Sequence, residues 1–131
     1  TIGSVTFTGY DAKDADAPIF VRLLNLLNAI RGMSPFSDLT ADEEQLLGQL
    51  VLRWQRDEQF TVGDLMQNSG RTSPSTIYRR LIALRDKGLA DLRVDQNDRR
   101  VKFIQPTPLA HEYVQNFSAR LDAMIAGERP S

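Results

Sequence analysis

The residues best suited to chemistry in this chain are hydroxyls and arginines that follow Ser73 at short spacing. Four of them share one predicted helix, and 3.6-residue geometry turns them away from its apolar stripe: Ser75, Thr76, Arg79 and Arg80. Short hydroxyls can approach base edges or phosphates, and arginines can bind guanine or phosphate. This pattern is typical of a helix that reads the major groove of duplex DNA, although an ordinary amphipathic surface helix also fits it.

A second basic group lies further along, in a predicted β-hairpin. Arg99 and Arg100 stand at its tip, and Arg93 and Lys102 lie on its strands. A guanidinium at such a tip can enter a minor groove, while the other cations neutralise phosphates on either side. Asp98 would repel DNA, so we expect it to orient a neighbouring arginine by charge-assisted hydrogen bonding. The alternative is a charged hairpin that merely prevents edge-to-edge aggregation.

The charge of the chain is unevenly spread. The 131 residues carry a net charge of −1. From Arg71 to Lys102 there are nine basic and four acidic residues, a net charge of +5, whereas the remainder has seven basic and thirteen acidic residues, or −6. A basic patch on an acidic body is the electrostatic footprint of nucleic-acid binding, because phosphates respond to the local field. A solvated charged face is the other interpretation.

The elements that position these groups can be read from caps and periodicity. Ser73 and Pro74 are an N-cap and a first-turn proline, and Gly88 is the expected stop of the helix they open. Tyr78 lies on the flank of that helix, and we count it, with Ser73, among the candidate DNA-binding residues. The apolar stripe of the helix is predicted to be buried: Ile77, Leu81 and Leu84. Two alternating segments follow, around a turn at 95–98, and predict the hairpin: Leu92 and Val94, then Val101 and Phe103.

Two capping boxes predict two helices before the one that Ser73 opens. Thr40 with Glu43 opens a helix that ends near Asp57, and Thr61 with Asp64 opens a shorter one that stops at about 68–70. The helices at about 61–69 and 74–87 together form a candidate helix-turn-helix.

Helices are also predicted at both ends of the chain. The one at 18–31 has a broad apolar surface, which indicates either a subunit interface or a central core helix. The last begins after Thr107 and Pro108. Our candidate dimerisation residues lie on these two helices: Phe20, Leu23, Leu24, Leu27, Tyr113, Phe117 and Leu121. Residues 1–17 are expected to be a flexible arm, with a short strand possible at Val5–Phe7, and 18–131 a single winged-helix domain with a DNA-binding core at 39–106.

Other functions find little support in the sequence. No cysteine is present, which excludes disulfides and thiolate zinc sites. His111 is the only histidine and has no second ligand at metal spacing, and no phosphate loop or nucleophile motif occurs. We therefore expect no enzyme, cofactor or metal, no membrane segment, and a cytoplasmic location.

The order of these motifs resembles the MarR-type winged-helix transcription regulators. The resemblance is carried by Ser73-Pro-Ser-Thr, Asp98-Arg-Arg and Thr107-Pro-Leu, over about 39–114. It implies a mainly α fold with a small β-hairpin wing, and a homodimer on a palindromic operator. It also implies that Arg100 is the wing arginine of the minor groove, with Asp98 as its supporting acid.

The chain departs from that family after the wing, where its members usually have two helices and this sequence has room for one. A small-molecule effector between the dimerisation and reading helices is possible in the family, and Trp54, Tyr113, Phe117 and Arg22 could line its pocket, but the residues do not support one. The alternative function is a winged-helix protein–protein adaptor without specific DNA binding.

Overall fold

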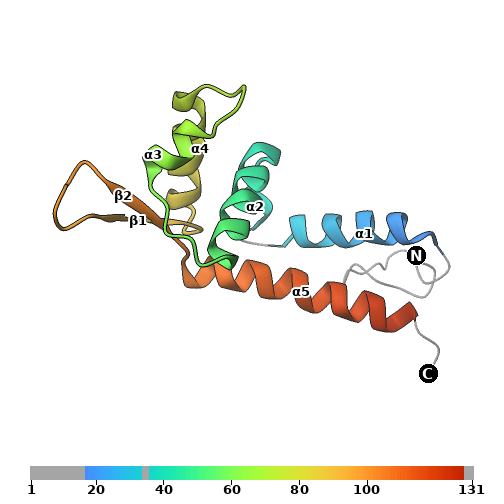
Figure 1. Cartoon of the computed structure of the whole chain (residues 1–131). Coiled ribbons are helices and arrows are strands. Elements are labelled where there is room, and N and C mark those ends of the chain that lie inside the picture. Colours follow the sequence, from blue (N-terminus) through green and yellow to red (C-terminus); the bar gives the residue numbers. More distant parts are fainter. Residues whose placement is uncertain (1–16, 34–35, 129–131) are drawn as a thin grey trace. The chain divides into compact units, whose positions relative to one another are not determined.

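The computed structural model describes residues 17–33 and 36–128 (Figure 1). They divide into two compact units, one running from Thr40 to His111 and the other formed by the described residues up to Leu39 and from Glu112 onward. The possible strand at Val5–Phe7 and nearly all of the expected arm lie outside the described residues. The single-domain interpretation of 18–131 stays a prediction.

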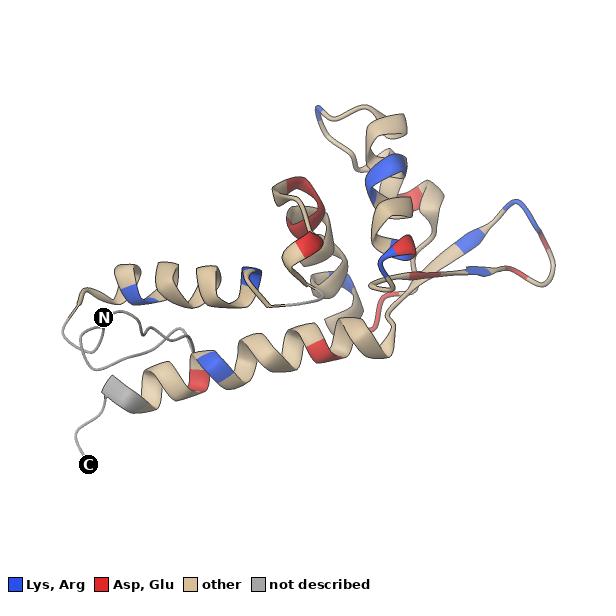
Figure 2. Cartoon of the chain, turned by 180° about the vertical axis from the view of Figure 1, so that it is seen from behind, with Lys and Arg blue, Asp and Glu red and all other residues tan. Residues whose placement is uncertain are grey.

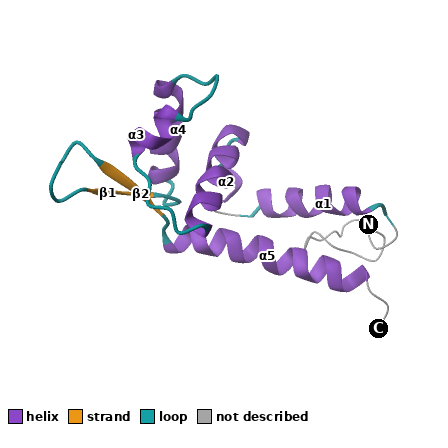
Figure 3. Ribbon diagram, in the orientation of Figure 1, coloured by secondary structure: helices purple, strands orange, loops and turns teal. Residues whose placement is uncertain are grey.

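The Thr40–His111 unit is a winged helix-turn-helix (Figure 3). Its elements follow in the order α2 (Ala41–Gln55), α3 (Val62–Gln67), α4 (Pro74–Asp86), β1 (Asp91–Val94), β2 (Lys102–Gln105) and the start of α5 (Pro108–Glu128). The two strands pair antiparallel, with Leu92 opposite Ile104. The prediction of a mainly α fold with a β-hairpin between helices is therefore confirmed.

Local capping chemistry explains where the helices begin. In both capping boxes, the threonine hydroxyl accepts the backbone N–H of the acid three residues on, and the acid accepts the threonine N–H. Ser73 caps α4 by accepting the N–H of Thr76, and Pro74 occupies the first turn. Gly88 ends this segment with a φ of +82°, a left-handed conformation that favours glycine.

Leucines and isoleucines from several elements form the core of this unit, as the periodicity predicts. Burying this apolar surface holds the short α3 and the hairpin in place, since neither would be stable alone. The buried leucines and isoleucines of this unit are Leu46, Leu47, Leu50, Leu65, Ile77, Leu81, Leu84, Leu89 and Ile104.

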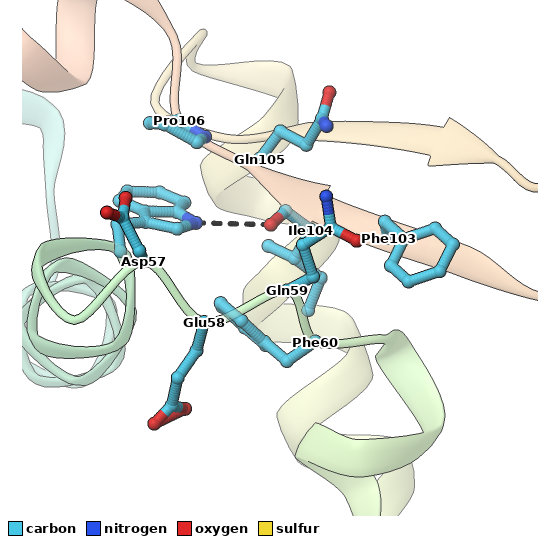
Figure 4. A pocket seen from close by; sticks show the side chains of 9 residues that line it. Asp57, Glu58, Gln59, Phe60, Phe103, Ile104, Gln105 and Pro106 are labelled. Atoms are coloured by element: carbon cyan, nitrogen blue, oxygen red, sulfur yellow. Dashed lines mark hydrogen bonds between the residues drawn. The ribbon is translucent and has the colours of Figure 1, made fainter.

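The hairpin is anchored at its base by contacts with the segment before α3 and with α2. The backbone N–H of Ile104 donates to the carbonyl of Phe60 at 3.0 Å, and Thr61 forms an isolated bridge with Phe103. The indole Nε1 of Trp54 donates to the Ile104 carbonyl at 3.1 Å (Figure 4). Strand β2 is thus held by its pairing with β1 and, at the base of the hairpin, by these contacts. The far end of the hairpin protrudes from the α3–α4 pair (Figure 1).

The second unit contains α1 (Ile19–Arg31), the short 3-10 helix η3 (Phe36–Asp38) and the rest of α5. Helix α1 runs alongside α5 (Figure 1), and Leu26, Ile30 and Met124 form a buried cluster. Phe117 and Leu121 pack against this cluster. None of the described helices is long and apolar enough to cross a membrane.

The dimerisation residues of α1 selected in the sequence analysis are not the ones that this helix buries. Arg22, Leu26 and Ile30 are buried, whereas Phe20 is 64% exposed and Leu24 42% exposed. Apolar residues lie almost all round this helix, so the 3.6-residue period could not decide which stripe packs on α5.

Candidate nucleic-acid interface

The exposed face of α4 begins with a cluster of hydroxyls. Ser75 is exposed, whereas Thr76 is half-buried. The Ser73 hydroxyl donates to Thr76 Oγ1 at 2.8 Å while it accepts the Thr76 N–H at 3.3 Å. Ser73 and Thr76 therefore support the start of the helix, and Ser75 presents the more accessible hydroxyl.

Two arginines on the next turn of α4 differ in their surroundings. Arg79 is exposed and makes no ion pair within the described part of the chain. Arg80 was expected to point outward, but its Nη2 lies 3.2 Å from Oδ2 of Asp42 in α2, and only 27% of its side chain is exposed. The physical reason is the packing of α2 against α4, which brings the acidic first turn of α2 within ion-pair distance of Arg80. A role for Arg80 in DNA binding stays a prediction.

The loop of the hairpin is built on a carboxylate. Asp95 accepts the backbone N–H groups of Asn97 and Asp98, at 3.2 and 3.0 Å. The Val101 N–H donates to the Asp98 carbonyl at 3.0 Å. The predicted turn at 95–98 is therefore present, and it orders the backbone that carries the tip arginines.

Asp98 and Arg100 form a two-point ion pair at this loop. Arg100 Nε donates to Asp98 Oδ1 at 3.0 Å and Nη2 donates to Oδ2 at 3.1 Å, and the Arg100 N–H also donates to Oδ1. These hydrogen bonds from Arg100 hold the pKa of the Asp98 carboxyl below its usual value, and the carboxylate raises the pKa of Arg100 in turn. The Arg100 side chain is nonetheless 89% exposed. The pair thus orients a guanidinium that faces solvent.

The strands contribute two further cations. The Arg93 guanidinium lies over the Phe103 ring, 4.7 Å from its centroid. Such cation–π stacking limits the motion of the side chain without neutralising its charge. Lys102 is half-buried and makes no ion pair within the described residues, and Arg99 at the tip is exposed.

The basic character of this unit is local (Figure 2). From Thr40 to His111 there are eleven basic and ten acidic residues, a net charge of only +1. Acids of α2 neutralise part of the basic segment, because Asp42 pairs with Arg80 and Glu43 with Lys87. Arg53 of α2 makes no ion pair in the described part of the chain and lies over the Phe60 ring. The other cations of this unit without such a pair lie in the α3–α4 turn, on α4 and in the hairpin: Arg71, Arg79, Arg93, Arg99 and Lys102.

A cavity beside these cations involves residues that the sequence analysis did not select. It is lined by the start of α3, by α4 and by the hairpin, and we call it the wing notch: Thr61, Val62, Gly63, Tyr78, Arg100, Val101 and Lys102. Tyr78 is 40% exposed on the flank of α4, as predicted. The α3 residues carried no signal in the sequence beyond their capping box, because their approach to the hairpin depends on the fold.

A second groove lies at the base of the hairpin (Figure 4). Trp54, Phe60 and Phe103 line it together with the turn at Asp57 and Glu58. Of the side chains considered for an effector pocket, Trp54 belongs to this unit and the other three to the second unit. No effector site is assigned on this basis.

The candidate dimerisation residues fall into two groups. Tyr113 packs edge-on against Phe36 and Phe117, with ring centroids 5.0 Å apart in each case, and Phe117 and Leu121 contact the buried cluster. Leu23 and Leu27 are half-buried. The clearly exposed apolar side chains of this unit lie on α1 and near the end of α5: Ile19, Phe20, Val21, Leu24 and Ile125.

Comparison with known proteins supports the resemblance seen in the sequence. No protein-family model and no curated protein matches the chain. Among solved structures, the MepR–DNA complex of S. aureus is similar, with 26% identity over 82% of this chain and 76% of that one and a TM-score of 0.63. A MarR-like transcriptional regulator from Thermotoga maritima shares 18% identity over 93% of this chain and 84% of its own, with a TM-score of 0.59. The heme sensor protein PefR from Streptococcus agalactiae shares 17% sequence identity over 81% of this chain and 70% of its own, with a TM-score of 0.56.

These matches extend over most of the chain and identify its fold as that of the MarR-type winged-helix regulators. The predicted resemblance is confirmed, and the fold is one of transcription regulators rather than of enzymes.

Proposed function

We propose that this chain is a transcription regulator that binds duplex DNA sequence-specifically as a homodimer. Helix α4 enters the major groove, and Arg100 enters the adjacent minor groove. The observation that carries the proposal is the Asp98–Arg100 pair, which holds an 89% exposed guanidinium at the end of a protruding hairpin. A narrow minor groove has an enhanced negative potential and attracts such a side chain.

The surroundings of α4 support the same assignment. Ser75 and Arg79 are exposed on its outer face, and Arg71 lies in the turn before it. Hydroxyls and arginines in this arrangement can contact base edges and phosphates. The similar MepR structure was determined with DNA, which adds support from a protein of the same fold.

The homodimer is supported by the apolar surface of α1. Phe20 and Leu24 remain exposed after α1 has packed on α5, and Ile125 is exposed near the end of α5. A second copy would remove this apolar surface from water. Two copies would also bind two half-sites of a palindromic operator. DNA binding places the protein in the compartment that contains the chromosome, which is the cytoplasm in a bacterium.

The test is binding of the purified protein to labelled duplexes, first random and then enriched by repeated selection. We expect affinity to fall by roughly a thousandfold between about 50 and 200 mM salt, because phosphate contacts release counterions. Selection should also converge on a palindromic sequence. If the protein binds no duplex at low salt, the proposal is wrong, and the protein–protein adaptor becomes the better interpretation.

A further inference from the structure

The wing notch lies between the two elements that we assign to DNA, and so far only the charge of Lys102 at its edge has been related to phosphates. We propose that it binds one phosphate of the DNA backbone, with Lys102 and Tyr78 as donors and Gly63 as its open floor. This inference rests on the proposed function and adds a specific contact to it.

The place of the notch in the unit supports this assignment. It is bounded by Tyr78 of α4 on one side and by Arg100 and Lys102 of the hairpin on the other. With α4 in a major groove and the hairpin in the neighbouring minor groove, a sugar–phosphate strand must pass between them, because one backbone strand separates adjacent grooves. The notch lies along the path of that strand.

The side chains of the notch suit a phosphate. Lys102 offers an ammonium group with three donors and makes no ion pair in the described part of the chain. Tyr78 offers a phenolic hydroxyl and is 40% exposed. Arg100 also lines the notch, but its guanidinium is already paired with the Asp98 carboxylate. The notch thus supplies one uncompensated positive charge and one neutral donor, which is a common pair of phosphate contacts.

Gly63 is the observation that points most directly to a ligand. It is the second residue of the six-residue α3, an exposed position where alanine would favour the helix more than glycine does. Its φ is not in the left-handed region, and an added Cβ would meet only Thr61 Oγ1, at 3.6 Å, an ordinary contact. Neither strain nor packing therefore requires a glycine here. Glycine does allow another backbone to approach closely, and the backbone of a DNA strand fits this space.

The first experiment compares two glycines that lie in exposed helical positions. Gly63→Leu fills the notch, whereas Gly48→Leu places the same side chain on α2, where an added Cβ meets nothing within 4 Å. We expect Gly63→Leu to weaken binding to a selected duplex by about tenfold, the typical value of a charged hydrogen bond. Gly48→Leu should bind like the wild type, and both variants should melt at or above its temperature.

The second experiment identifies the phosphate. Single phosphates of the selected duplex are replaced in turn by neutral methylphosphonate, and each duplex is titrated with wild-type protein and with Lys102→Gln. One position should weaken wild-type binding by about tenfold but have little further effect on Lys102→Gln, because the two changes remove the same contact. Lys102→Gln should lower the salt slope by about one and weaken binding equally on an unrelated duplex.

Three outcomes separate this inference from the proposed function. If the wild-type protein binds no duplex DNA, both the phosphate site in the notch and the proposed function are rejected. Wild-type binding with a Gly63→Leu variant that matches Gly48→Leu, and with no phosphate coupled to Lys102, rejects the notch and leaves DNA binding intact. If Gly63→Leu does not fold, the coupling between Lys102 and the methylphosphonate decides by itself.

Discussion

At the scale of single residues, the ion pair at the wing is the feature most open to test. Asp98 is a carboxylate on a surface proposed to meet DNA, so its simple electrostatic effect is repulsive. Its contacts with Arg100 give it another role, because two parallel hydrogen bonds restrict the guanidinium to one direction. The net effect of Asp98 on binding depends on which of these two terms is larger.

We expect Arg100→Ala to weaken operator binding by about tenfold, in line with a lost charged hydrogen bond. Asp98→Asn should also weaken it, though less, because an amide cannot accept both arginine hydrogen bonds. Fluorescence anisotropy with the selected duplex measures both changes. An Asp98→Asn variant that binds more tightly than wild type would mean that repulsion outweighs orientation, and unchanged affinity of Arg100→Ala would exclude the wing tip from the groove.

A second residue-scale prediction concerns Glu43, which is largely buried and pairs with Lys87 at the end of α4. Burial alone would raise the pKa of this carboxyl, but the hydrogen bonds from Lys87 and Thr40 and the charge of Lys87 outweigh it, so the pKa lies below its usual value. A lowered folded-state pKa stabilises the protein above the unfolded value, and this contribution is lost as pH falls through the folded value.

Glu43→Gln should therefore lower the free energy of unfolding by about 1–2 kcal/mol at neutral pH. The glutamine can still complete the capping box with Thr40, so the change isolates the charge. Urea unfolding at several pH values checks this. The difference between the two proteins should shrink as pH falls below about 4.5, and a difference that stays constant would show that the charge of Glu43 is not its cause.

At the scale of elements, the junction after α4 fixes how the reading helix joins the hairpin and α5. The Thr107 hydroxyl donates to the Gly88 carbonyl at 2.6 Å and accepts the Ala110 N–H at 3.1 Å. One side chain thus caps α5 and holds the end of the α4 segment. The left-handed φ of Gly88 turns the chain at this point.

Gly88→Ala should destabilise the protein by about 1 kcal/mol, because a Cβ is unfavourable at a φ of +82°. The added Cβ meets Leu109 Cδ2 at 3.5 Å, an ordinary contact, so the backbone rather than crowding causes the loss. Gly48→Ala is the matched control and should stabilise by up to about 1 kcal/mol, since it improves an exposed helix. Denaturant unfolding of both variants tests this, and equal stabilities would contradict it.

How much could be predicted from the sequence depends on how far apart in the chain the contacting residues are. Capping boxes, the Ser73 cap and the Gly88 stop depend on residues three or four apart, so the helix starts and the hairpin were predictable. The indole bond from Trp54 to Ile104 joins residues 50 apart, and the Glu43–Lys87 pair joins residues 44 apart. Such contacts depend on how helices cross, which no local pattern specifies.

In the candidate site, too, contacts between near neighbours in the sequence could be predicted and contacts between distant residues could not. The pairing of Asp98 with an arginine was predictable because the two residues are neighbours in a turn. The ion pair of Arg80 with Asp42 and the approach of Gly63 to the hairpin were not, because both require the packed unit. On α1, apolar residues on nearly every side left the choice of buried stripe to tertiary packing.

At the scale of the whole molecule, the question is whether two copies bind DNA together. Two copies on one operator would double the number of phosphate contacts and fix the spacing of the half-sites. The surface available for this is the exposed part of α1, since Phe117 and Leu121 pack within their own chain. A polar substitution at Phe117 would therefore disturb folding as well as assembly, and it cannot test the dimer.

Leu24→Asp is the appropriate test, because Leu24 is 42% exposed and its loss leaves the buried cluster intact. A charge in an apolar interface is costly to desolvate, so we expect sedimentation to show a dimer for the wild type and a monomer for Leu24→Asp. Operator affinity should fall by at least about tenfold because each copy then binds one half-site alone. Leu52→Asp is the control, since Leu52 is 62% exposed on α2, and it should sediment like the wild type. A monomeric wild type would reject the dimer, and a Leu24→Asp dimer with intact affinity would place the interface elsewhere.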